Sequence, residues 1–154
     1  MNPNDKISQH FTWGEVTFSE TAIRHGIDNN PPEELMPNIN RMAKFMEQVR
    51  FKLSGRPILI SSWYRSPEVN KLIGGAQSSN HMRGIACDFI CPTLGSPLRV
   101  AQELENSDLD YDQLIHEFGR WVHIGLSEGH RRESLTAYLV EGKTFYEKGL
   151  KEVP

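Results

Sequence analysis

The stretch His81–Phe89 reads HMRGIACDF and places a histidine seven positions before an aspartate, with a glycine and an alanine between them. Asp88 stands inside an otherwise apolar run, Ile85–Ile90, whose short length and β-rich composition are typical of a buried strand. A buried carboxylate is costly unless it is paired or bound to a cation. The small residues would let the backbone pass close to whatever the two side chains hold. The stretch therefore indicates a buried strand with a functional carboxylate, entered through a loop that carries His81.

A second strand-like run, Trp121–Leu126, carries His123 among apolar neighbours. Two imidazoles and one carboxylate form a common ligand set of catalytic zinc, which leaves a fourth coordination position open. The spacing of His81, Asp88 and His123 fits such a site. It fits equally well a structural hydrogen bond between the aspartate and one histidine, with the other histidine unrelated.

A zinc-dependent hydrolase also needs a base that takes a proton from the attacking water. His116 and Glu117 both precede His123 on the preceding strand of the predicted sheet. A two-residue turn at Gly119–Arg120 would place His116 opposite His123, whereas a three-residue loop at Gly119–Trp121 would place Glu117 there. The periodicity of the sequence does not choose between these registers.

The remaining patterns predict helices first and strands last. Apolar residues recur every three or four positions over Glu33–Leu53, which predicts the longest helix. Shorter helices are expected from Thr17 or Ser19, over Ser66–Gly74 and over Ser96–Asn106. Strands are expected over Pro57–Ser62, Ile85–Ile90, Gln113–Phe118, Trp121–Leu126, Leu135–Val140 and Thr144–Tyr146. This order predicts a single α+β domain over residues 1–154, in which an antiparallel sheet packs with helices.

Composition restricts the partners. A formal net charge of −3 without a long basic stretch argues against nucleic acid, and no apolar run is long enough to span a bilayer. Residues 1–16 lack the pattern of a secretory signal, so we expect synthesis in the cytoplasm and a separate route of release. Cys87 and Cys91 are expected to be buried free thiols. We expect a monomer.

Three stretches in this order resemble the successive motifs of the zinc DD-peptidases of the M15 family: SSWYRSPEVNKLIGG (61–75), SSNHMRGIACDF (78–89) and DQLIHEFGRWVHIGL (112–126). This family comprises D-alanyl-D-alanine carboxypeptidases and L-alanyl-D-glutamate endopeptidases of peptidoglycan, and it shares a fold with the hedgehog signalling domain. The resemblance is closest to the short, phage-encoded branch. It covers almost the whole chain, since FTWGEVTFSETAIRHGIDNNPP (11–32) resembles the N-terminal segment of that branch.

The resemblance implies one zinc ion with the ligands His81, Asp88 and His123. It also implies that Glu117, six residues before the last histidine, is the base. Another common position of the base is occupied here by Arg120, which cannot accept a proton. Arg65 and Ser79 match positions that hold substrate near the metal. From its own context, Arg65 is also consistent with a solvated or salt-bridged side chain.

The sequence departs from many relatives at four positions: Trp63, Asn80, His116 and Trp121. None of these departures removes a ligand, and Trp63 is expected to narrow or reshape the cleft.

The implied function is zinc-dependent hydrolysis of peptide bonds in the stem peptides or cross-links of bacterial peptidoglycan. Such an enzyme would act on the cell wall, after release from a phage-infected host or within a virion. Two alternatives belong to other classes of protein. One is a zinc-stabilised module that binds wall peptide without cutting it, and the other is a structural protein of the phage virion.

Overall fold

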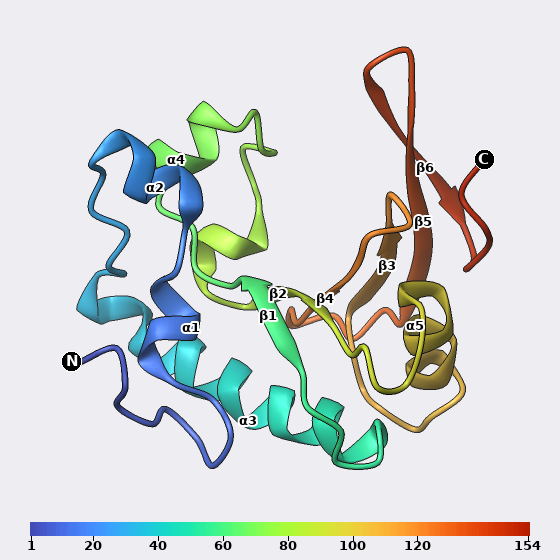
Figure 1. The fold of residues 1–154 in the computed structure, drawn as a ribbon, viewed down its shortest axis with the longest axis horizontal. Helices are drawn as coiled ribbons and strands as arrows, with labels where there is room; N and C mark the ends of the chain where they lie inside the picture. The colour runs from blue at the N-terminus through green and yellow to red at the C-terminus, as the bar shows by residue number, and fades with distance from the viewer. The chain divides into compact units, whose positions relative to one another are not determined.

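The computed structural model describes all residues, 1–154, and has an α+β fold with one six-stranded mixed sheet in the order β1-β2-β4-β3-β5-β6 (Figure 1). The helices are α1 (Trp13–Thr17), α2 (Glu20–His25), η1 (Glu33–Leu35), α3 (Met36–Lys52), α4 (Pro67–Leu72), η2 (Asn80–Arg83) and α5 (Pro97–Glu105). The strands are β1 (Leu59–Ser62), β2 (Ala86–Ile90), β3 (Gln113–Glu117), β4 (Trp121–Gly125), β5 (Glu133–Val140) and β6 (Lys143–Lys148). The predicted fold class is confirmed. The chain divides into two compact units, Met1–Glu47 with Ile60–Cys87 and Gln48–Leu59 with Asp88–Pro154.

The helices of the first unit begin where the sequence offers caps. The Thr12 and Glu15 side chains form a capping box at the start of α1. The hydroxyl of Ser19 accepts from the backbone N–H of Ala22, so that α2 begins at the second of the two predicted starts. At α4 the hydroxyl of Ser66 does the same, and Pro67 occupies the first turn, where its missing N–H costs nothing.

The structure shows why a glycine, Gly84, stands in the middle of the stretch His81–Phe89. It ends η2 with a φ of 75°, in the left-handed region that only glycine adopts at little cost. A Cβ atom at this position would lie 2.7 Å from Cγ1 of Ile39 in α3, too close for any larger residue. The carbonyl of Gly84 accepts a hydrogen bond of 3.0 Å from the buried indole of Trp63. The connection from η2 to β2 therefore packs directly on α3.

In the second unit, α5 packs against β3 and β4 (Figure 1). Alternate residues of these strands, Leu114, Val122 and Ile124, are fully buried, as are Val100, Ala101 and Leu104 of α5. Because successive side chains of a strand point to opposite faces, Ile115, Glu117 and His123 lie on the face that α5 does not cover.

The sheet is mixed rather than antiparallel throughout, which corrects one detail of the prediction. β3 pairs antiparallel with β4 but parallel with β5, and β5 pairs antiparallel with β6. The end of β4 lies beside the start of β3, because the two strands run in opposite directions. A short loop after β4 can therefore reach the other edge of β3, where β5 begins and runs in the same direction as β3. The β5–β6 hairpin is longer than predicted and stands out in Figure 1.

An ion pair between the buried Asp112 and the partly exposed Arg131 holds the loop between β4 and β5. Nε and Nη2 of Arg131 donate to the carboxylate of Asp112 at 3.0 and 2.9 Å, and the backbone N–H of Arg131 donates to it at 3.1 Å. The carboxylate is only 1% exposed, although the arginine is 55% exposed. These hydrogen bonds from Arg131 hold the pKa of Asp112 at about 2, well below its ordinary value. The pair fixes the loop to the residue that precedes β3.

We expect Asp112→Asn to lower the free energy of unfolding at pH 7 by about 1–2 kcal/mol, less than the full pKa shift implies, because solvent screens the exposed side of Arg131. Since the pKa is depressed in the folded state, this stabilisation is present above pH ~4 and is lost as the pH falls towards about 2. Urea unfolding of the wild type and of Asp112→Asn at several pH values measures this difference in the free energy of unfolding. A stability difference that stays constant down to pH 2 would contradict this reading.

None of the helices combines the length and the apolar character that crossing a bilayer requires. Cys87 and Cys91 are buried and form no disulfide, as predicted.

Candidate metal centre

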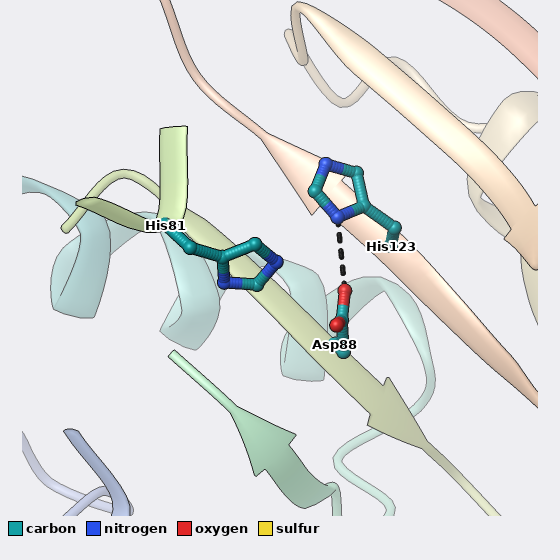
Figure 2. A group of neighbouring side chains, drawn as sticks. All are labelled: His81, Asp88 and His123. Atoms are coloured by element: carbon teal, nitrogen blue, oxygen red, sulfur yellow. Dashed lines mark hydrogen bonds and ion pairs between the residues drawn. The ribbon is translucent and has the colours of Figure 1, made fainter. Parts of the chain in front are cut away.

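Three side chains that the sequence singled out are grouped in the structure. His81, Asp88 and His123 each offer one ligand atom, and these atoms lie within 4.8 Å of one another. Figure 2 shows the three side chains, which come from η2, β2 and β4. Two imidazole nitrogens and one carboxylate oxygen are a donor set that suits zinc.

The orientation of His81 is fixed by the backbone of its own unit. Nδ1 of His81 lies 2.7 Å from the carbonyl oxygen of Trp63. A carbonyl can only accept, so the proton of the neutral ring is on Nδ1 and the lone pair that can bind a metal is on Nε2. The backbone N–H of Arg65 donates to the carbonyl oxygen of His81 at 3.1 Å. Outer contacts of this kind set the tautomer and direction of a metal-binding histidine.

Two carboxylates converge on one nitrogen of His123. Nδ1 of His123 lies 2.9 Å from Oδ1 of Asp88 and 3.5 Å from Oε1 of Glu117. The exposed fractions of the three side chains are only 11–14%. Two carboxylates so close together in a largely buried place repel each other unless a positive charge lies between them.

The strand register places Glu117, and not His116, on the face of His123. Both predicted registers are wrong, because the structure pairs His123 with Ile115 and Glu117 with Trp121. The turn between the strands has positive φ at both Phe118 and Gly119, and the N–H of Arg120 donates to the carbonyl of Glu117. Glu117 is therefore one pair further along the same face as His123.

His116 points to the opposite face, where it has a structural role. It is 2% exposed, and its Nδ1 donates to the carbonyl oxygen of Lys151 at 3.0 Å. This contact attaches the C-terminal segment to the sheet and accounts for the histidine without a metal.

Trp121 was not assigned a role from the sequence. Its indole Nε1 donates to Oε1 of Glu117 at 3.2 Å, and its ring packs edge-on against Phe118. The same carboxylate oxygen thus has an indole on one side and the imidazole of His123 on the other. The cross-strand pairing of Trp121 with Glu117 would have predicted this contact. That pairing is known only once the register of β3 and β4 is known, and the sequence did not determine the register.

Arg65 and Ser79 both contact the segment that carries His81. The hydroxyl of Ser79 accepts from the backbone N–H of His81 at 3.3 Å, at the start of η2. Nη1 of Arg65 donates to Oδ1 of the buried Asn70 at 3.2 Å. A Cβ atom at Gly75 would overlap that amide and lie 2.9 Å from the guanidinium. Gly75 is needed because the loop passes so close to both groups.

Trp63 does not shape a cleft in the way we expected from the sequence. It is fully buried, its indole donates to the carbonyl of Gly84, and its ring packs edge-on against Phe11 at 6.3 Å. Its bulk fills the core, while its carbonyl orients His81.

We expect apo protein to bind one zinc ion per chain, and His81→Ala to weaken binding by more than about 100-fold, beyond the effect of losing an outer contact. Titration calorimetry of chelator-treated protein with zinc measures both. The matched control is His116→Asn, whose amide can still donate to Lys151 and which should bind zinc as the wild type does. Equal loss of zinc in both variants would contradict the assignment.

The chain was compared with known proteins. Residues 9–125 match the family model described as Peptidase M15, which is more than half of the chain and includes all three candidate ligands and Glu117. No curated protein matches the chain. The peptidases of this family depend on zinc, which agrees with the donor set found here. The chain belongs to the M15 family of peptidases.

Proposed function

We propose that this protein is a zinc-dependent peptidase that cuts the stem peptides or cross-links of bacterial peptidoglycan. The observation that supports it most is the position of Glu117, which shares the Nδ1 side of His123 with the proposed ligand Asp88. A module that only binds peptide has no need of a second carboxylate beside the metal ligands.

The proposed ligands are Nε2 of His81, Nδ1 of His123 and the carboxylate of Asp88. Zinc held there would act as a Lewis acid on the scissile carbonyl and make water a better nucleophile at neutral pH. Glu117 takes the proton of the attacking water and passes it to the departing amino group. The indole N–H of Trp121 keeps the carboxylate of Glu117 turned towards His123.

Arg65 is the proposed anchor for a carboxylate of the stem peptide. A guanidinium binds a carboxylate through two parallel hydrogen bonds, and Asn70 and Gly75 limit the directions in which this one can point. Ser79 is proposed to donate its hydroxyl proton to the substrate, since its oxygen already accepts from the backbone of His81.

The test is incubation of the zinc-loaded protein with disaccharide-peptide fragments of defined stem length, with and without a chelator, followed by mass spectrometry of the products. Zinc-dependent loss of one alanine would identify a carboxypeptidase. A cut between L-alanine and D-glutamate, or at a cross-link, would identify an endopeptidase. Either result supports the proposal.

Glu117→Gln should reduce turnover by about 10²–10⁴-fold, the range typical of a lost general base. Zinc content and melting temperature should stay close to those of the wild type, because the amide occupies the same volume. Full activity of this variant would remove Glu117 from the mechanism. If the zinc-loaded wild type cuts no fragment but binds the stem peptide, the protein is a binding module instead.

A further inference from the structure

Tyr146 of β6 lies in one cross-strand row with Glu117. The register pairs Trp121 of β4 with Glu117 of β3, Glu117 with Ala137 of β5, and Ala137 with Tyr146. Directly opposite residues of neighbouring strands point to the same face of a sheet. Tyr146 therefore belongs to the face that carries Glu117 and His123.

The residue between them is small. Ala137 is fully buried and contributes only a methyl group to this face. The backbones of β3 and β6 are two strand spacings apart, roughly 10 Å, a span that a glutamate and a tyrosine side chain can bridge together over an alanine.

The phenol of Tyr146 lies within the electrostatic influence of the acidic groups of the site. Burial raises the pKa of this hydroxyl, and the negative charges of Glu117 and Asp88 raise it further. The phenol is thus neutral at pH 7 and can donate a hydrogen bond.

Other tyrosines of this unit have structural roles. Tyr138, next in β5 after Ala137 and on the opposite face, donates to Glu147 at 2.6 Å and stacks on Phe145. The hydroxyl of Tyr111 is hydrogen-bonded to Ser134 at 2.8 Å. Tyr146 differs from both, because it is 57% exposed to solvent and lies in the cross-strand row of Glu117.

We propose that the hydroxyl of Tyr146 donates a hydrogen bond to a backbone carbonyl oxygen of the bound stem peptide, close to the bond that is cut. This inference rests on the proposed function and adds a substrate-binding residue from the β5–β6 hairpin, outside the residues 9–125 that match the family. The acceptor is a carbonyl oxygen because each peptide bond beside the one that is cut offers such an oxygen, and a neutral phenol hydroxyl can donate to it.

The first test is the steady-state kinetics of Tyr146→Phe with a disaccharide-pentapeptide as substrate. Loss of one hydrogen bond made in the ground state and the transition state alike should raise KM by about tenfold and leave kcat within about twofold. The matched control is Tyr138→Phe, which removes a hydroxyl from the opposite face of the same hairpin and should leave KM unchanged.

The second test measures binding without turnover. In zinc-loaded Glu117→Gln protein, adding Tyr146→Phe should raise the Kd for the same disaccharide-pentapeptide by about tenfold, as measured by calorimetry. Adding Tyr138→Phe should leave this Kd unchanged.

The outcomes separate this inference from the proposed function. If the wild type cuts the substrate and Tyr146→Phe changes neither KM nor Kd, the inference is wrong while the peptidase stands. A fall in kcat alone would also overturn it, because the hydroxyl would then position Glu117 rather than hold substrate. If the wild type does not cut the substrate, but Tyr146→Phe weakens binding and Tyr138→Phe does not, the hydrogen bond from Tyr146 to the stem peptide is supported and the proposed peptidase activity is wrong.

Discussion

The fold has to hold two carboxylates, those of Asp88 and Glu117, beside the same nitrogen of His123, at 2.9 and 3.5 Å. Without a positive charge between them this arrangement is unfavourable, and with a divalent cation it becomes favourable. The register of β3 and β4 meets this requirement, since a shift by one residue would turn Glu117 to the face that α5 covers. The indole of Trp121 then holds the carboxylate of Glu117 in place.

In the first unit, the segment Trp63–Arg65 is hydrogen-bonded to both the side chain and the backbone of His81. The carbonyl of Trp63 orients the imidazole of His81, and the next residue but one, Arg65, donates its backbone N–H to the carbonyl of the same histidine. A proposed ligand and a proposed substrate anchor are thus tied together through the backbone. Gly84 lets this assembly pack on α3, where any side chain would meet Ile39. The small residues of the opening stretch serve packing as much as chemistry.

The sequence predicted what depends on local signals. Ser19, Ser66 and the run around Asp88 mark element boundaries through capping and apolar pattern, and the structure has these elements in the expected places. Both predicted registers of β3 and β4 were wrong because the observed register depends on the left-handed backbone of Phe118. A phenylalanine side chain does not favour this conformation, so the sequence did not indicate it. The parallel pairing of β5, which brings Tyr146 into the row of Glu117, depends on a loop held by a long-range ion pair.

The proposed mechanism depends on one zinc ion bound by His81, Asp88 and His123. A crystal of the zinc-loaded protein, with anomalous difference maps recorded above and below the zinc absorption edge, tests it directly. We expect one peak that disappears below the edge, at about 2.0–2.2 Å from Nε2 of His81, Nδ1 of His123 and a carboxylate oxygen of Asp88. A zinc peak held by other residues, with either imidazole beyond bonding distance, would contradict it.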